Sequence, residues 1–309
     1  MLAIFLKTLP FFAVIGIGYA AAFRRFITTE GTAWLTKFVF YFALSAMLFQ
    51  LAANLSLAQI WDPAMVMAYL AATGAVYLGV FTIARLRGEP MGVATIEAHC
   101  GSIGNTGFLG LPMLGLLLGP SSSGPLLLML TIDSVLFASI ATILITAERE
   151  GGLRLRTMRA LGLGLARNPM IVSMVAGFVW SGIGLPMPGP LDETLGLLAR
   201  SATPCALFVI GASLADKSAE RLAAAGWLAF AKLVLHPALA AVMALWVFRV
   251  GPEASAAMIA AAALPVAGNV YILARHYGVA PQRASAAILI STAISIVTLP
   301  IVIAHVAGL

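Results

Sequence analysis

The feature that most constrains this chain is a series of ten long apolar stretches, separated by short polar segments. They lie at 3–23, 33–53, 64–84, 92–118, 125–146, 169–185, 193–214, 223–248, 255–277 and 284–306. A hydrocarbon layer of about 30 Å needs roughly 20 apolar residues as an α-helix. The stretches are too long for strands and do not alternate with a period of two. They therefore predict an all-α polytopic membrane protein with ten spanning helices.

Charged residues are scarce, at 10% of the 309 residues, whereas hydrophobic residues make up 61%. Soluble domains carry about 25% charged residues, so an ordinary soluble enzyme and a disordered chain are both excluded. No basic stripe with interleaved aromatic residues occurs, and we expect no nucleic-acid partner. Both cysteines, Cys100 and Cys205, lie in apolar runs. We therefore expect neither a disulfide framework nor a metal site, and no cofactor.

The distribution of basic residues predicts how the chain crosses the membrane. Most of the 18 lysines and arginines follow the first, third, fifth, seventh and ninth stretches. They are Arg24, Arg25, Arg85, Arg87, Arg149, Arg154, Arg156, Arg159, Arg167, Lys217, Arg221, Arg275 and Arg283. Basic loops stay in the cytoplasm. This pattern places both termini outside the cytoplasm and explains the net charge of +6 as a topology signal.

The longest polar segment, 147–168, divides the chain into two halves of five stretches, 1–146 and 169–309. We interpret it as a basic cytoplasmic linker. An odd number of helices in each half inverts the second half relative to the first. Short matches support a repeat: Leu48-Phe49 recurs as Leu207-Phe208, and Gly104-Asn105 recurs as Gly268-Asn269. Inverted repeats with interrupted helices are typical of secondary transporters.

Two of the stretches carry residues that weaken a helix near the middle of the membrane. Glycine and proline cost about 1 and 3 kcal/mol relative to alanine inside a helix. A break there exposes backbone groups, and the start of a half-helix attracts anions. We expect a substrate site at Gly104, Asn105, Thr106, Pro265, Gly268 and Asn269, with Gly107, Gly110 and Pro112 as hinge positions. The alternative is that these residues only allow close helix packing, but two breaks with the same Gly-Asn pair favour a site.

Ionisable side chains inside the stretches are a second set of candidates, because buried charges in membranes are costly and often functional. We expect proton or charge coupling at Asp133, Glu97, His99 and Lys232. The alternatives remain a structural pair or neutral acid for Asp133, an interfacial pair for Glu97 and His99, and a snorkelling lysine. His236 precedes Pro237 and is interpreted as a packing residue.

Several motifs resemble those of a known family. Residues 104–112 (GNTGFLGLP) resemble the fourth-helix motif of the auxin efflux carriers of bacteria and plants. Residues 263–274 (ALPVAGNVYILA) are similar to the ninth-helix motif, although Gly268 stands where members often have alanine. Residues 232–237 (KLVLHP) resemble the eighth-helix pattern. Residues 202–208 (ATPCALF), followed by 211–214 (GASL), are similar to the seventh-helix motif, and 203–208 look most like the malonate-transporter branch.

This resemblance implies a fold like that of the bile acid–sodium symporters, with helices four and nine broken and crossing at the substrate site. It implies a scaffold of helices one, two, six and seven that forms a homodimer. The implied substrates are small organic anions: auxin in plants, and malonate or malate in bacterial relatives. We thus expect a secondary transporter of the bacterial inner membrane, with the proton favoured over sodium as coupling ion.

Two other classes of function are the alternatives. A membrane-embedded enzyme would need a catalytic constellation, and the sequence has no His-Glu-x-x-His pattern and no paired deep aspartates. We therefore expect that the chain is not an enzyme. An anion channel would pass its substrate without stimulation from the opposite side of the membrane.

Overall fold

The computed structural model describes residues 2–55, 61–150, 162–215 and 222–306. In these ranges the chain is helical, and its extended pairing is limited to one antiparallel bridge between Gly104 and Val266. Part of the predicted linker, 151–161, lies outside the described residues, as do Lys217 and Arg221.

Helices of the first half follow one another with short connections, and several contain a π-helical turn. They are α1 (Leu2–Phe23), α2 (Thr29–Phe38), η1 (Val39–Ala43), α3 (Leu44–Ala53), α5 (Pro63–Leu86), α6 (Met91–Ser102), η2 (Thr106–Gly110), α7 (Leu111–Leu118), η3 (Pro120–Ser122), α8 (Ser123–Ile132), η4 (Asp133–Phe137) and α9 (Ala138–Glu150).

The second half has a similar order of long and short helices. They are α11 (Pro169–Ile183), α12 (Gly189–Ala215), α13 (Leu222–Phe230), η5 (Ala231–Leu235), α14 (His236–Ala241), η6 (Val242–Val247), α15 (Pro252–Ala262), α16 (Gly268–Tyr277) and α17 (Pro281–Val306).

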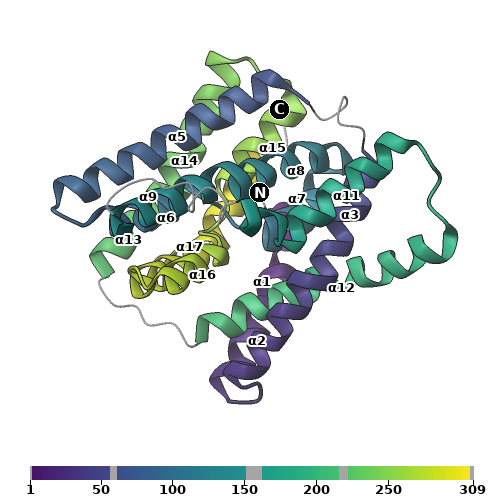
Figure 1. Cartoon of the computed structure of the whole chain (residues 1–309), viewed down its shortest axis with the longest axis horizontal. Coiled ribbons are helices and arrows are strands. Elements are labelled where there is room, and N and C mark those ends of the chain that lie inside the picture. Colours follow the sequence, from purple (N-terminus) through teal and green to yellow (C-terminus); the bar gives the residue numbers. More distant parts are fainter. Residues whose placement is uncertain (1, 56–60, 151–161, 216–221, 307–309) are drawn as a thin grey trace.

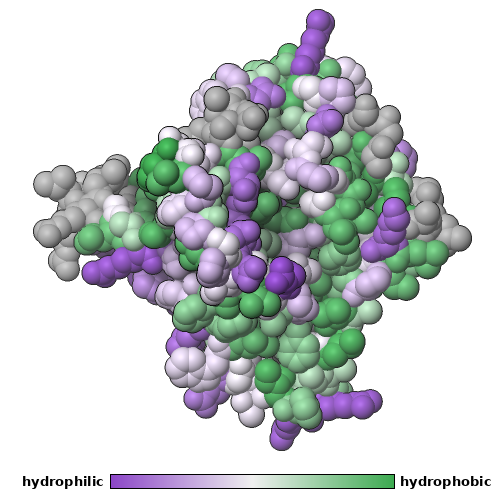
Figure 2. Space-filling model, turned by 90° about the vertical axis from the view of Figure 1, so that its right-hand side faces the viewer, coloured by the Kyte–Doolittle hydropathy of each residue, from purple (hydrophilic) through white to green (hydrophobic). Residues whose placement is uncertain are grey.

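Seven helices among the described residues are long and apolar enough to cross a membrane. They are Ile4–Phe23, Thr29–Ala53, Pro63–Leu86, Pro120–Glu150, Gly189–Ala215, Ala223–Val247 and Pro281–Val306. The stretch predicted at 169–185 is the shorter helix α11, and those at 92–118 and 255–277 are each interrupted. Broad hydrophobic areas cover the surface in Figure 2, as expected for a multi-pass membrane protein.

Helices begin where the sequence supplies a cap. The Asp62 carboxylate accepts hydrogen bonds from the backbone N–H groups of Ala64 and Met65, and Pro63 follows at the first helical position of α5. The Asn168 side chain accepts from Met170 N–H at the start of α11, again before a proline. Both patterns satisfy N–H groups that a helix start leaves free.

The helices pack as two groups (Figure 1). The frame group contains α1, α2, η1, α3, α11 and α12, with its main contacts between α1 and α12 and between α3 and α11. The crossing group contains the helices from α5 to α9 and from α13 to α17.

Glycines let the backbones of the frame group touch. A Cβ on Gly18 would lie 2.1 Å from Phe208 O, and one on Gly211 would lie 1.8 Å from Ile15 O. Helices in lipid gain stability chiefly from such close packing, because burial of apolar side chains gives little advantage there.

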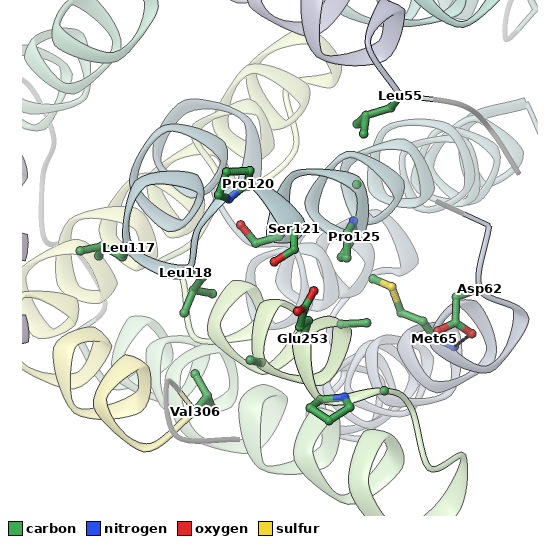
Figure 3. Close-up of a pocket in the computed structure, with 16 residues that line it drawn as sticks. Leu55, Asp62, Met65, Leu117, Leu118, Pro120, Ser121, Pro125, Glu253 and Val306 are labelled. Carbon is green, nitrogen blue, oxygen red and sulfur yellow. Dashed lines mark hydrogen bonds between the residues drawn. The ribbon is translucent and has the colours of Figure 1, made fainter. Parts of the chain in front are cut away.

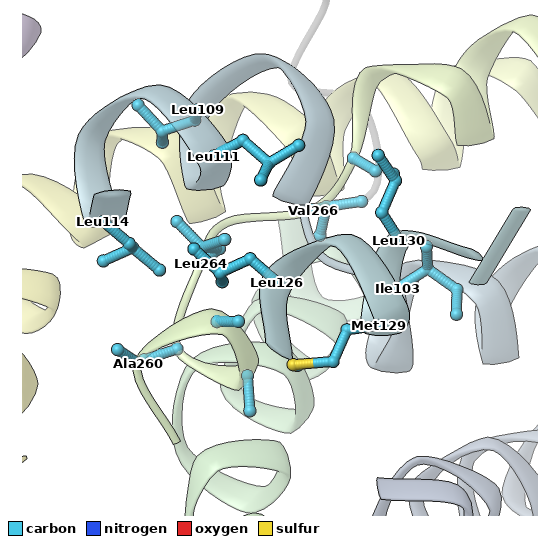
Figure 4. Close-up of a cluster of buried hydrophobic side chains, with 14 of the residues drawn as sticks. Ile103, Leu109, Leu111, Leu114, Leu126, Met129, Leu130, Ala260, Leu264 and Val266 are labelled. Carbon is cyan, nitrogen blue, oxygen red and sulfur yellow. The ribbon is translucent and has the colours of Figure 1, made fainter. Parts of the chain in front are cut away.

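A buried apolar cluster holds the crossing group together at its centre. Figure 4 shows side chains of η2, α7 and α8 facing Ala260, Leu264 and Val266. A Cβ on Gly110 would lie 2.6 Å from Leu264 Cδ1, so this glycine leaves room for the leucine. The cluster fixes the interruptions at 103–105 and 263–267 against α8.

Candidate functional site at two interrupted helices

Two interrupted helices meet at the centre of the crossing group. Helix α6 ends at Ser102 and α15 ends at Ala262, and the segments that follow run antiparallel. Asn105 N–H donates to Pro265 O at 2.9 Å, and Ala267 N–H donates to Ile103 O at 3.1 Å. These bonds replace the helical hydrogen bonds that each interruption removes, as a membrane interior requires.

A helical segment starts after each interruption without a side-chain cap. Asn105 stands at the start of η2, and Ala267 precedes α16; neither side chain bonds to the helix it precedes. Uncapped N–H groups and the helix dipole give such a start a partial positive charge. Both starts can therefore attract an anion.

A cavity of about 320 Å³ opens beside these two starts. Its size falls within the range of roughly 300–1,000 Å³ that small-molecule sites occupy. The predicted site residues that line it are Gly104, Asn105, Gly107, His99, Asp133, Gly268 and Asn269. Those that do not line it are Thr106, Pro265, Gly110, Pro112, Glu97 and Lys232.

Other residues that line this cavity were not predicted from the sequence. Phe40 of η1 and Met170 of α11 bring the frame group into the wall, so the cavity lies between the two groups. On α16, Ile272 and His276 also line it. Their spacing of three and seven residues from Asn269 puts them on the same helix face, a signal that was present in the sequence.

Asp133 and His99 are buried in the cavity wall. Asp133 Oδ1 accepts a hydrogen bond from Tyr69 Oη at 2.7 Å, whereas Oδ2 has no partner among the described residues. The His99 ring packs edge-on against Tyr77, and its Nδ1 also lacks a hydrogen-bond partner in the described part of the chain. Buried polar atoms are seldom left unpaired in folded proteins, so these two atoms are available to a ligand.

Lys232 does not snorkel, because its side chain is fully buried. Its Nζ donates to the carbonyl of Ala262, the last residue of α15, and lies 3.1 Å from His236 Nδ1. A Cβ on Gly104 would be only 3.2 Å from this Nζ. The ammonium group thus touches both interruptions and opposes the negative end of the α15 dipole.

Asp133 and Lys232 form no direct ion pair with each other. His236, predicted to be a packing residue, is buried, and its Nε2 lies 3.0 Å from Thr73 Oγ1. Tyr69, Thr73, Lys232 and His236 thus form a polar layer behind the cavity.

Glu97 is paired away from the cavity. It forms ion pairs with Arg87 and Arg283, and Arg283 also binds Glu89 at 2.7 Å. Near these pairs, the Glu148 carboxylate accepts from the N–H groups at the start of α6. These contacts join α6 to α9 and α17 at one end of the crossing group.

A second cavity, of about 870 Å³, lies at the other end of the crossing group. Figure 3 shows Glu253 in its wall between Leu117 and Leu118 of α7 on one side and Asp62 and Met65 on the other. Between the two cavities the chain passes through buried Leu109, Leu111 and Leu114. These leucines belong to the apolar cluster of Figure 4.

Apolar helices around a polar, interrupted centre are typical of integral membrane transport proteins. Residues 3–303 match the family described as "Membrane transport protein", and the chain belongs to this family. The family, which includes the auxin efflux carriers, consists of transporters. This confirms the expectation that the chain is not an enzyme.

Individual relatives agree with this placement. A "Putative malonate transporter" of Rhizobium meliloti is 32% identical over 298 residues, which cover 94% of this chain and 92% of the relative. The "Uncharacterized transporter YfdV" of Escherichia coli is 24% identical, over 95% and 94%. The "Probable auxin efflux carrier component 5c" of Oryza sativa is 31% identical over 160 residues, 50% of this chain and 42% of the relative.

Proposed function

We propose that this protein is a secondary transporter that moves a small carboxylate, of the malonate or malate type, by alternating access. The observation that carries the proposal is that two uncapped helix starts meet at one cavity. Asn105 stands at the first start, and Asn269 lies in the first turn after the second. Each asparagine supplies two amide donors, and each helix start adds backbone N–H groups. This concentration of donors suits an anion, and the malonate relative indicates the kind.

The proposed topology is ten spans in two inverted halves, 1–146 and 169–309, joined by the linker at 147–168. Contacts between the halves support it. The Thr73–His236 contact joins residues 163 apart, close to the spacing between the two Gly-Asn pairs. The bridge between Gly104 and Val266 joins the two interrupted segments in the same way. Contacts of this kind are expected near a two-fold axis that relates two repeats.

The proposed location is the bacterial inner membrane, with both termini outside the cytoplasm. Basic loops then face inward, and two residues of the smaller cavity, Asn168 and His276, lie next to the basic residues Arg167 and Arg275. Along the chain, buried leucines of the apolar cluster lie between the two cavities, and the proposed state is inward-open. The frame group corresponds to helices one, two, six and seven and is the proposed surface for a homodimer.

In this proposal Gly104, Asn105, Gly268 and Asn269 line the substrate site, Thr106 and Pro265 support it from outside the cavity, and Gly107, Gly110 and Pro112 shape the hinge. Asp133, His99 and Lys232 surround the site and are the groups proposed to respond to a coupling proton. Glu97 contributes charge at the cytoplasmic end through its two arginines.

Uptake of labelled malonate into proteoliposomes tests this function. We expect saturable uptake that is stimulated by unlabelled malonate on the other side, which a channel does not show. Asn105→Ala and Asn269→Ala should each lower uptake at least 100-fold, because each removes amide donors from the anion. Asn54→Ala, at the exposed end of α3, is the matched control and should transport normally.

A proton gradient and a sodium gradient, imposed separately, identify the coupling ion. We expect an inward proton gradient to raise accumulation. Normal uptake by both asparagine variants would refute the site, and correctly folded protein that transports neither malonate nor malate would refute the substrate class.

A further inference from the structure

The two sides of the smaller cavity differ chemically. The side formed by the interruptions offers donors: the amides of Asn105 and Asn269 and the N–H groups of two helix starts. The side formed by η4 offers an acceptor, the carboxyl group of Asp133. An anion alone would satisfy the first side and leave the second unpaired.

Asp133 Oδ2 has no hydrogen-bond donor among the residues that the structure describes. Tyr69 of α5 already donates to Oδ1, and Lys232 of η5 is bonded to Ala262 O and His236. His99 of α6 lines the same cavity without a hydrogen bond to Asp133. The surrounding groups therefore compensate the charge of Asp133 in part and leave Oδ2 free to accept.

We propose that the substrate donates a hydrogen bond to Asp133 Oδ2 while its carboxylate lies at the two helix starts. The substrate class is then a small monoanion that carries a donor: a half-protonated dicarboxylic acid or a hydroxy acid. A fully ionised dicarboxylate would bring a second negative charge against Asp133 and would offer it no hydrogen. A dicarboxylic acid thus enters with one proton on its second carboxyl group, and that proton crosses with it.

This inference rests on the proposed carboxylate transport, and fixed-charge analogues of malonate test it. Malonamate is a monoanion with an amide donor. Monomethyl malonate has the same charge and nearly the same size but no donor. A site built around a hydrogen bond rejects an analogue that lacks it. In competition with labelled malonate, we expect malonamate to inhibit uptake at least tenfold more strongly than the methyl ester.

The variant Asp133→Asn sharpens the test, because its amide can donate to the ester as well as accept. The preference for malonamate should fall to threefold or less. Thr131→Val, two residues away, removes a hydroxyl that bonds to Leu127 O and contacts Met174 Sδ, and it should keep the wild-type preference. Equal inhibition by the two analogues in the wild type, or an unchanged preference in Asp133→Asn, would overturn the inference.

Ligand binding, measured without transport, distinguishes a failure of this inference from a failure of the proposed transport function. Thermal stabilisation of the purified wild-type protein reports binding without transport, and malonamate should stabilise it more than the methyl ester. Malonate uptake without discrimination between the analogues refutes the donor inference alone. Absence of both malonate uptake and malonate binding refutes the proposed function and this inference together.

Discussion

The two interruptions carry the same Gly-Asn pair in different surroundings. Asn105 lies inside its interruption and is only 6% exposed, whereas Asn269 lies in the first turn of α16 and is exposed to the cavity. The interrupted segment is 103–105 in the first case and 263–267 in the second. The same motif therefore places one asparagine in a buried position and the other where its side chain is accessible to a substrate.

Their helix ends differ in the same way. The end of α15 is bonded by the ammonium group of Lys232, whereas the end of α6 has no cationic side chain among its described partners. Val266 N–H in the second interruption also finds a side-chain acceptor, Ser291 Oγ, at 3.1 Å. The second interruption thus receives side-chain hydrogen bonds from Lys232 and Ser291, whereas the first is held by backbone hydrogen bonds to the second.

Lys232→Met should have the largest effect of the variants that test the difference between the two interruptions. The change removes the charge at the end of α15, leaves Ala262 O unpaired and isolates Asp133. Loss of a buried charged hydrogen bond costs about 1–3 kcal/mol or more. We expect a fall of several degrees in the thermal midpoint of the purified protein and at least tenfold lower uptake. Lys37→Met, on an exposed face of α2, should change neither, and equal behaviour of the two variants would contradict the assigned role.

Gly104→Ala and Gly268→Ala compare the two motifs directly. A Cβ on Gly104 would lie 3.1 Å from Ala261 O and 3.2 Å from Lys232 Nζ, whereas one on Gly268 meets nothing within 4 Å. Overpacking costs about 1–3 kcal/mol, and alanine in a helix gains up to about 1 kcal/mol over glycine. The first variant should have a lower thermal midpoint than wild type and the second an equal or higher one. The reverse order would show that the interruptions are packed differently.

Ser291→Ala gives the smallest expected effect. It removes the acceptor for Val266 N–H, and single hydrogen bonds between membrane helices contribute about 0.6 kcal/mol, up to about 1.7. Ser295→Ala on the same helix is the matched control, because its hydroxyl bonds only within α17. A thermal midpoint reduced by a degree or two in Ser291→Ala alone would support the dependence of the second interruption on α17. Identical midpoints would argue against it.

Helix-breaking residues were sufficient to locate the interruptions from the sequence. Gly104, Asn105, Gly268 and Asn269 were predicted at one site, and the structure places all four in the wall of one cavity. Local backbone preference explains this success, since glycine and proline act where they stand. The seven long spans were visible for a similar reason, because hydropathy is a property of each segment.

Contacts between distant segments could not be predicted in this way. Glu97 and His99 were considered as a pair, yet Glu97 binds Arg87 and Arg283 while His99 faces the cavity. The sequence allows Lys232 to be either a snorkelling lysine or a functional residue. Its bond to Ala262 O depends on how α15 approaches η5. Side-chain direction and helix packing decide these partners, and neither can be deduced from spacing within one helix.

The close contact between α1 and α12 has a mechanical consequence. A Cβ on Gly211 would lie only 1.8 Å from Ile15 O, so the two backbones are in close contact at this glycine. A sliding movement of one helix along the other would bring side chains into collision with the backbone. Helices α1 and α12 therefore behave as one rigid unit within the frame group. In the proposed alternating access, the interrupted helices therefore move at the surface between the frame group, to which these two helices belong, and the crossing group, where Phe40 of η1 and Met170 of α11 border the cavity.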